Sequence, residues 1–366
     1  MKRTPEPLRL GFPVKVLGKP GLKSNDSRRW QSEPHLKFSL DYLRQIFDYL
    51  EETDIRMYRM SSDLAPYVTH PEMPQFHGQV RECSRQLKVV GERARKLHLR
   101  LSFHPSQYIV LNSPDKALVK KSVWDVESQA EMLDCMELGP EAVVVIHVGG
   151  AYGDRRAGCE RWVRTWETLP KHARSRLVLE NDDLRYSAAD VLWIQERTGV
   201  RLIFDYQHFW CFNPEGLELR PTVERFLETW PRGVRPKIHF STPNTAMREV
   251  EKKNAEGKKK IAHQEPIWTG HADFANPFEF ATFMRAANGL EFDVMLESKS
   301  KDLALLRLGK DLLRYAPDVA RRFGLVAKHA EQPVARLVKV YESLRFHVSS
   351  ELHGARWGTR HGRLPM

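Results

Sequence analysis

The chain has 366 residues, of which 41% are hydrophobic and 29% are charged, and its formal net charge is +11. This composition is typical of a folded protein and excludes general disorder, and no apolar run approaches the roughly 20 residues of a membrane-spanning helix. The length allows two or three average domains, but also a single α/β barrel, which typically takes about 250 residues.

The four cysteines are widely spaced and form no CxxC pair, which excludes a zinc ribbon or a redox dithiol and suits a reducing compartment. The first ten residues contain charges and two prolines but no apolar stretch of the kind found in a secretory signal. We therefore expect a cytoplasmic protein that is neither secreted nor embedded in a membrane.

Eight short aliphatic or β-branched runs alternate with longer segments of helical period, and several are apolar on both faces, as buried parallel strands are. In chain order these predicted strands are 8–12, 55–60, 99–103, 142–147, 176–180, 201–205, 236–240 and 292–297. Eight strand–helix units predict a closed (β/α)₈ barrel. A doubly wound open sheet is the alternative, although no glycine-rich phosphate loop follows the first strand.

Helix positions are indicated by apolar spacing and by capping residues. Ser113 and Asn276 each precede a proline and are expected to cap helices, with Glu279 adding a capping-box pattern after Asn276. Ser300 is expected to open a last helix. The i, i+4, i+7 spacing of one helix face runs through Leu36, Leu40, Leu43, Phe47 and Leu50.

Two connections are long, 65–75 after the second strand and 241–276 after the seventh, and loops of this length are usually functional or disordered. We assign residues 1–316 to the barrel domain and 317–366 to a basic C-terminal extension that is partly helical or flexible.

Positive charge gathers in two parts of the chain, and a basic balance indicates a polyanionic partner, most often nucleic acid. From Lys310 to Met366 there are 11 Lys or Arg and 5 Asp or Glu, a net +6. The alternative is solvated surface lysine that serves solubility. The second cluster comprises Lys252, Lys253, Lys258, Lys259 and Lys260.

Imidazoles and carboxylates follow six consecutive predicted strands at their carboxyl ends, where barrel enzymes place their chemistry. One such residue alone would be an ordinary loop residue, but six strands in succession indicate a shared site. His70 and His271 lie in the two long loops and are expected to reach the same place. The strand-end set is His104, His147, Glu180, Asp205 with His208, Lys237 with His239, and Glu297.

So many ionisable groups in an apolar mouth are costly unless they are paired, and divalent cations resolve this cost because carboxylate and neutral imidazole are their ligands. Without cysteine, the set favours more than one ion of Mn²⁺, Zn²⁺ or Mg²⁺. Paired ions stabilise both the attacking and the leaving oxygens of a phosphodiester. A basic protein with this mouth is therefore expected to be a phosphodiesterase acting on nucleic acid, with a metal-dependent sugar isomerase or aldolase as the alternative.

Taken together and in order, the motifs of this chain resemble those of the UV damage endonucleases, over roughly residues 8 to 303. The matching segments are LGFP (10–13), RM (59–60), THP (69–71), HPSQY (104–108), HVGGAYG (147–153), LEND (179–182), FDYQH (204–208), PKIHFS (236–241), GHADF (270–274) and MLESKSK (295–301).

This resemblance implies a (β/α)₈ enzyme that nicks duplex DNA immediately 5′ to UV photoproducts (cyclobutane dimers and 6-4 photoproducts) and some other lesions. The products would be a 3′-hydroxyl and a 5′-phosphate. It implies up to three divalent ions, usually Mn²⁺, with Mg²⁺, Co²⁺ or Zn²⁺ as alternatives. We expect a monomer associated with the nucleoid.

Carried over by position, the resemblance assigns nine metal ligands, among which Glu180 and Asp205 are the candidates for bridging ions. A carboxylated lysine beside the ions would be Lys237, and the catalytic set would be Glu180, Lys237, Asp205 and His239. The nine ligands are His70, His104, His147, Glu180, Asp205, His208, His239, His271 and Glu297.

The DNA-contacting residues are also carried over from the resemblance or inferred from charge. Gln107 and Tyr108 match the pair that the family inserts into the duplex at the lesion, where a tyrosine stacks between separated bases. Arg59 is either a phosphate clamp or part of a structural ion pair. Outside the resemblance, the basic tail and the lysine cluster, in particular Lys258, Lys259 and Lys260, are expected to contact phosphates.

Two positions depart from the family pattern. Phe12 stands where the family often has tyrosine, and Ser106 replaces a common glycine in the loop that carries Gln107. The alternatives to this function are an apurinic endonuclease of the endonuclease IV type and a non-catalytic DNA-binding barrel that has lost its metals.

Overall fold

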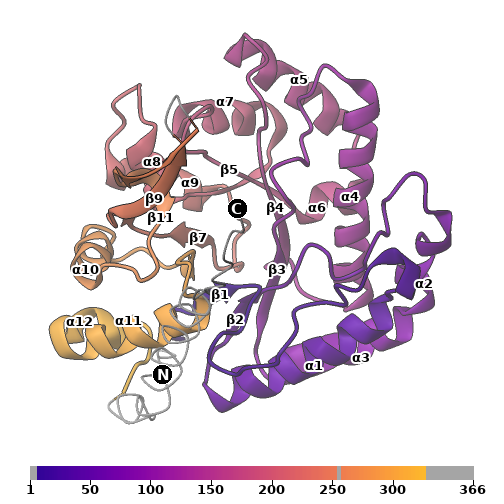
Figure 1. The fold of residues 1–366 in the computed structure, drawn as a ribbon, viewed down its shortest axis with the longest axis horizontal. Helices are drawn as coiled ribbons and strands as arrows, with labels where there is room; N and C mark the ends of the chain where they lie inside the picture. Colours follow the sequence, from indigo (N-terminus) through magenta and orange to yellow (C-terminus); the bar gives the residue numbers. More distant parts are fainter. Residues whose placement is uncertain (1–5, 254–256, 327–366) are drawn as a thin grey trace, which may run out of the picture. The chain divides into compact units, whose positions relative to one another are not determined.

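The computed structural model describes residues 6–253 and 257–326, with the backbone alone at 248, 252 and 253, and its centre is an eight-stranded parallel sheet (Figure 1). The strand order is β6-β5-β4-β3-β2-β1-β12-β7. The strands are β1 (Leu10–Pro13), β2 (Met57–Arg59), β3 (Arg100–Phe103), β4 (Val143–His147), β5 (Leu177–Glu180), β6 (Arg201–Ile203), β7 (Lys237–Phe240) and β12 (Asp293–Leu296).

The sheet closes on itself between its two end strands, β6 and β7. Asp205 and His239 form a parallel bridge just beyond β6, and the amide of His239 donates a hydrogen bond to the carbonyl of Phe204 at 2.9 Å. The predicted eight-stranded barrel is therefore confirmed, and the open doubly wound sheet is wrong. The closure also places two expected site residues side by side.

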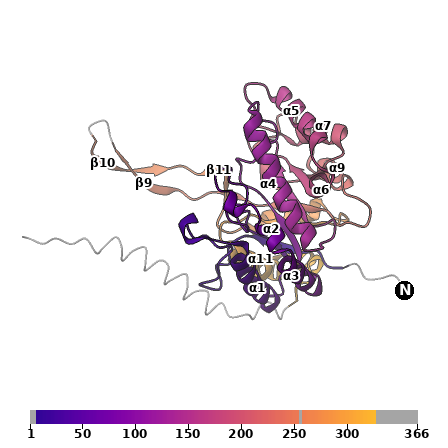
Figure 2. The ribbon, with the colours of Figure 1, turned by 90° about the vertical axis from the view of Figure 1, so that its right-hand side faces the viewer.

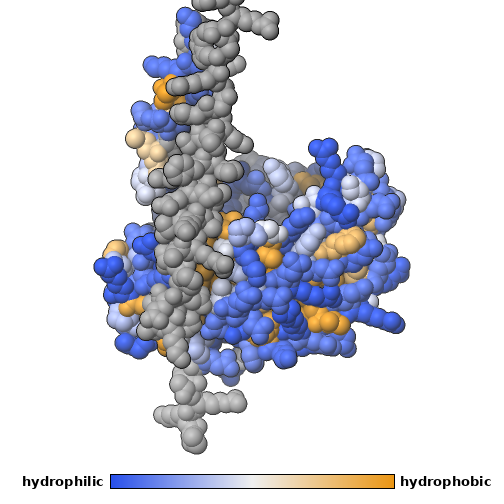
Figure 3. Space-filling view, turned by 60° about the horizontal axis from the view of Figure 1, so that its bottom comes forward, coloured by the Kyte–Doolittle hydropathy of each residue, from blue (hydrophilic) through white to orange (hydrophobic). Residues whose placement is uncertain are grey.

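Helices surround the sheet on its outer face (Figure 1). They are α1 (Leu36–Glu52), α2 (Gln79–Glu82), α3 (Ser84–Lys96), α4 (Lys116–Cys135), α5 (Arg155–Thr168), α6 (Lys171–Arg176), α7 (Ala188–Thr198), α8 (Tyr206–Cys211), α9 (Leu219–Glu228), α10 (Pro277–Ala286), α11 (Lys301–Tyr315) and α12 (Pro317–Arg322), with 3₁₀ turns at Trp30–Ser32 and Pro74–Phe76. On the face in Figure 3 the described surface is mainly hydrophilic. In the part of the chain that the structure describes, no helix is long and apolar enough to cross a bilayer.

The predicted helix starts at Asn276 and Ser300 are confirmed, but α12 follows the helix after Ser300, so that helix is not the last. The capping box expected from Glu279 is wrong, because the Asn276 amide donates to the Thr242 hydroxyl instead. The apolar residues predicted for one face of α1 are all buried, and the Asn276 side chain caps α10 by accepting from the amides of Phe278 and Glu279. The expected cap at Ser113 is wrong. Asp115 caps α4 instead, and the Ser113 hydroxyl accepts from the Asp115 amide. A carboxylate is the stronger acceptor there, because it also interacts favourably with the helix dipole.

The long connection after β7 is structured. It holds two antiparallel ribbons, one of β8 (Pro243–Asn244) with β11 (Ile267–His271) and one of β9 (Arg248–Lys253) with β10 (Lys259–Gln264). Figure 2 shows the β9–β10 ribbon extending away from the barrel. The β8–β11 ribbon forms its base and returns the chain to the barrel mouth at His271.

The compact unit that contains the barrel runs to Leu325, beyond the expected boundary at 316. The Arg322 guanidinium donates to the carbonyls of Met284 and Leu290, and the amide of Leu8 donates to the carbonyl of Arg322 at 2.8 Å. Helix α12 is therefore part of the barrel unit. The rest of the expected basic extension, from residue 327, lies outside the described residues.

We expect the packing of α3 on α4 to make Gly91 irreplaceable. A Cβ at Gly91 would lie 1.8 Å from the carbonyl oxygen of Met136, so backbone must shift, and Gly91→Ala should lower the free energy of unfolding by about 3 kcal/mol. Gly309 in α11 is the matched control, because its Cβ would meet nothing closer than Leu325 at 3.8 Å. Gly309→Ala should raise stability by up to about 1 kcal/mol. Urea unfolding measures both, and equal effects would contradict this packing.

Candidate metal centre

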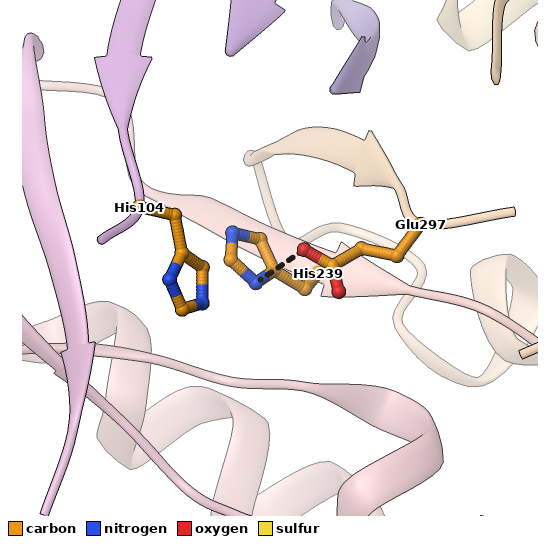
Figure 4. A group of neighbouring side chains, drawn as sticks. All are labelled: His104, His239 and Glu297. Atoms are coloured by element: carbon orange, nitrogen blue, oxygen red, sulfur yellow. Dashed lines mark ion pairs between the residues drawn. The ribbon is translucent and has the colours of Figure 1, made fainter. Parts of the chain in front are cut away.

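The carboxyl ends of the strands converge on one group of side chains at the barrel mouth. Figure 4 shows His104, which follows β3, close to His239 of β7 and Glu297, which follows β12. Glu180, the last residue of β5, lies between them. Its Oε1 is 2.8 Å from His239 Nδ1, and its Oε2 is 3.2 Å from His104 Nε2. Residues far apart in sequence thus meet because parallel strands end at the same edge.

Within the described residues, three sets of side chains have ligand atoms that all lie within 4.8 Å of one another. Glu180 belongs to two of the sets and so does His104, whereas Asp205 belongs to one. The three sets therefore form a continuous cluster. They are His104 with His239 and Glu297, His104 with His147 and Glu180, and Glu180 with Asp205 and His208.

Burial sets the electrostatics of the cluster. Glu180 and Asp205 are fully buried, and burial, together with the charge of Glu297, raises the pKa of both carboxyls. Burial, followed by the charge of Arg59, lowers the pKa of His104 to about 3. Burial likewise holds the pKa of His239 well below its usual range. These imidazoles are therefore neutral at physiological pH, which is the form that binds metal ions.

Glu297 is the ionised member of the cluster. Burial by itself raises its pKa, but the charge of Arg59 outweighs this effect and holds that pKa well below its usual range. Arg59 forms an ion pair with Glu297, and its side chain is only 14% exposed. Of the two roles expected for Arg59, the geometry favours the structural ion pair over the phosphate clamp.

Several polar atoms of the cluster have lone pairs or protons with no protein partner. Among the described residues, His147 Nδ1, His239 Nε2 and Asp205 Oδ2 are buried and make no hydrogen bond. Orphaned buried atoms of this kind are costly and rare. A divalent cation would satisfy acceptor atoms and offset the carboxylates, and carboxylate with imidazole is a donor set for Mn²⁺ or Zn²⁺. The residues therefore fit a metal centre.

Neighbouring polar groups orient two of the imidazoles, and the sequence did not single them out. Ser241 Oγ donates to Gln207 Oε1 at 2.6 Å, so it must accept from His271 Nδ1, also at 2.6 Å. This leaves His271 Nε2 free on the side of Glu297, 4.0 Å away. Fixing the ring nitrogen in this way is typical of metal-binding histidines. The only sequence signal for Ser241 was its position two residues after His239, a predicted site residue.

Asn181 performs the same task for the other imidazole. Its carbonyl accepts from His208 Nδ1 at 3.0 Å, and its side-chain amide exchanges two hydrogen bonds with the backbone of Asp205. One residue thereby fixes both the His208 ring and the chain at the barrel closure.

Lys237 is fully buried beside the cluster, and its Nζ lies 3.1 Å from the Ser102 hydroxyl. Burial, together with the charges of Arg100 and Arg59, holds the lysine pKa well below its usual range. The neutral form of the amine, which is the nucleophilic one, is therefore favoured more than in an exposed lysine.

His70 is the expected ligand that the structure leaves apart. It belongs to none of the three sets, and it lines a separate hollow beside Ser106. Its Nδ1 accepts from the amide of Glu72 at 3.3 Å, and its carbonyl accepts from His77 Nε2 at 2.8 Å. Its assignment as a ligand rests on the family resemblance alone.

The expected lesion probes stand at the rim of the cleft above the cluster. Gln107 and Tyr108 form an exposed turn after β3, and the Tyr108 side chain is 73% exposed. The cleft has a volume of about 760 Å³ and is lined by both probes, by Tyr152 and by members of the cluster, including His147. Lys258, Lys259 and Lys260 lie elsewhere, exposed at the start of β10.

A family model, curated relatives and a solved structure point to the same family. Residues 33–324 match the family model described as UV-endonuclease UvdE. The chain is 32% identical to the UV DNA damage endonuclease of Bacillus pumilus (strain SAFR-032) over 71% of its own length and 75% of the relative. It is also 32% identical to the UV DNA damage endonuclease of Bacillus velezensis, over 75% of its own length and 81% of that relative. The crystal structure of SacUVDE has 28% identity and a TM-score of 0.70, over 84% of this chain and 98% of that one.

We expect His239→Ala to remove bound metal, because His239 contacts both Glu180 and Glu297. After loading with Mn²⁺ and desalting, the variant should retain fewer ions per chain, or bind them more than about 100-fold more weakly. Elemental analysis and titration calorimetry measure this. The exposed His172 supplies the control, since His172→Ala should bind as many ions as the unaltered chain. Equal ion content in both variants would rule out this cluster as the metal centre.

Proposed function

The chain belongs to the UV-endonuclease UvdE family, and from this membership we propose that it nicks duplex DNA immediately 5′ to UV photoproducts and some other lesions. The products are a 3′-hydroxyl and a 5′-phosphate. The observation that carries the proposal is the continuous cluster of imidazoles and carboxylates on the floor of a cleft whose rim presents Tyr108. As part of the proposal, the protein acts as a monomer on nucleoid DNA.

We propose that the cluster holds up to three divalent ions, with Mn²⁺ the first expectation. When bound, such ions supply the Lewis-acid chemistry of phosphodiester hydrolysis. The seven clustered residues are the ligands that the geometry supports, with His271 adjoining through Glu297 and His70 carried over from the family. The seven are His104, His147, Glu180, Asp205, His208, His239 and Glu297.

The chain's own residues prepare the floor of the cleft in two ways. Asn181 and Ser241 fix the rings of His208 and His271, so the ligand atoms are positioned before any substrate arrives. The lowered pKa of Lys237 favours carboxylation of its amine, because a deprotonated lysine is a nucleophile toward carbon dioxide. That modification would add a negative group beside the cluster, and we propose it as part of the site.

The rim selects the lesion. Tyr108 and Gln107 project where a duplex lying over the cleft would meet them, and base–aromatic stacking is worth about 1–3 kcal/mol per base. A photoproduct already weakens stacking, so inserting a side chain costs less there than in intact DNA. Phosphate contacts from the lysine cluster, with Lys258 and Lys260 among them, belong to the same proposal, and such contacts strengthen binding without sequence choice.

The reaction is tested with a 5′-labelled duplex that carries one cyclobutane pyrimidine dimer. With Mn²⁺, a single product ending immediately 5′ of the dimer is expected on a sequencing gel, and EDTA should abolish it. Binding without cleavage in every divalent metal would contradict the proposal and favour a non-catalytic barrel.

We expect Glu180→Gln to reduce nicking by more than about 100-fold while leaving DNA affinity nearly unchanged, because Glu180 is shared by two sets of ligands at the floor and is not exposed to the duplex. Glu160→Gln, on the solvent side of α5, is the control. Normal turnover in the Glu180 variant would contradict the assignment of Glu180 as a metal ligand and catalytic residue.

We expect Tyr108→Ala to weaken recognition of the lesion in duplex DNA while leaving the hydrolysis of the phosphodiester intact. Loss of about 1–3 kcal/mol of stacking predicts a 5- to 150-fold lower rate on dimer-containing duplex at low substrate concentration. A substrate whose lesion lies in unpaired DNA should be affected much less. Tyr315→Ala, at an aromatic on α11 that is 46% exposed and lies outside the residues that line the cleft, should change neither rate. Identical losses on both substrates would assign Tyr108 to general DNA binding.

A further inference from the structure

The β9–β10 ribbon separates its residues into two faces of different charge. In an antiparallel pair, directly opposite residues share a face and successive residues alternate between faces. Three opposite pairs form the first face, which we name the basic face: Arg248 with Gln264, Val250 with Ala262, and Lys252 with Lys260. Three form the second, the mixed face: Glu249 with His263, Glu251 with Ile261, and Lys253 with Lys259.

The two faces differ in net charge by three. The basic face carries one arginine and two lysines and no acidic residue, a formal +3, whereas the mixed face carries two lysines and two glutamates, a formal 0. The mixed face also neutralises itself locally. Lys259 Nζ lies 2.8 Å from Glu251 Oε2, and His263 Nε2 lies 3.6 Å from Glu249 Oε1.

The dimensions of the basic face suit a phosphate backbone. Lys260 is exposed, and short residues, Val250 and Ala262, occupy the rung between the basic ends. Arg248 and Lys252 are four residues apart, about 13 Å along the strand at ~3.3 Å per residue. Duplex DNA carries one charge about every 1.7 Å of its axis, so this length faces several phosphates. A two-stranded ribbon also fits the width of a DNA groove.

The ribbon starts beside the candidate metal centre. Its base is the β8–β11 ribbon, which ends at His271, and the Gln207 amide holds that base by donating to the carbonyls of Trp268 and Gly270. From there the ribbon extends away from the barrel (Figure 2). A duplex bound over the cleft continues beyond it on either side, so a basic arm rooted at the rim is placed to meet it.

We propose that the basic face of the ribbon binds the phosphate backbone of duplex DNA outside the cleft, and that the mixed face does not. The proposal rests on the proposed function for its substrate, duplex DNA. It revises the contacts expected from the lysine cluster: Lys260 is a contact together with Arg248 and Lys252, whereas Lys259 is not.

Two double variants of the full chain test the proposal with equal loss of charge. Lys252→Gln with Lys260→Gln removes two charges from one rung of the basic face, and Lys253→Gln with Lys259→Gln removes two from the adjacent rung of the mixed face. Affinity for a fluorescent undamaged duplex is measured by anisotropy in EDTA, at salt concentrations from 50 to 200 mM. Unchanged thermal midpoints show that both variants are folded.

The basic-face variant should bind about tenfold more weakly, and the slope of log affinity against log salt should become shallower by about 1.8, or 0.9 for each lost phosphate contact. The mixed-face variant should keep the unaltered slope and an affinity within about twofold. Equal weakening in both variants, or none in the first, overturns the proposal.

Nicking of dimer-containing duplex, measured separately at saturating DNA with Mn²⁺, distinguishes this proposal from the proposed function. Absence of lesion-specific nicking by the unaltered chain would overturn the function and leave the comparison of the two faces intact. A chain that binds no duplex at all would overturn both.

Discussion

The burial of three carboxylates within reach of one another is the constraint on which the rest of the site depends. Glu180 and Asp205 are fully buried, and Glu297 is almost so, and like charges so placed cannot all ionise without compensation. Arg59 compensates Glu297, whereas Glu180 lies against the neutral imidazoles of His104 and His239. Asp205 lies beside His208 and raises the pKa of that imidazole. The same residues close the barrel, because Asp205 bridges to His239. Barrel closure and the demand for cations are therefore properties of the same few residues.

The opposite end of the barrel holds a buried carboxylate that is paired in a different way. Asp293, at the amino end of β12, is fully buried and accepts from the Arg9 amide and from the Arg100 guanidinium at 2.9 Å each, with Arg235 at 3.6 Å. Arg100 also lies over the Trp230 ring at 5.4 Å. The carboxylate there is satisfied by protein groups alone. Conversely, the unpaired acceptors at the mouth mark the functional end.

The barrel and most of the cluster were predictable because both follow from local patterns. Buried parallel strands are apolar on both faces, and polar residues just after them must meet at one mouth. What the sequence could not provide were hydrogen-bond partners chosen in three dimensions. Asn181, Ser241 and Gln207 look like ordinary polar residues until folding sets them beside the imidazoles. The sequence also could not decide which residue caps α4, because Ser113 and Asp115 are both good capping residues and only the structure shows that Asp115 is the cap. His70 matched a motif, but the structure places it in a neighbouring hollow.

The sequence pattern did not predict the ribbon after β7 for a related reason. A strand with charged residues on both faces has no hydrophobic period to detect. Its position is nevertheless physically reasonable. An antiparallel ribbon satisfies its own backbone hydrogen bonds, so it can extend from the barrel without needing a core. Because β8 and β11 pair at its base, the residues of the ribbon need not disturb the return of His271 to the mouth. This connection can therefore carry the ribbon without changing the candidate metal centre.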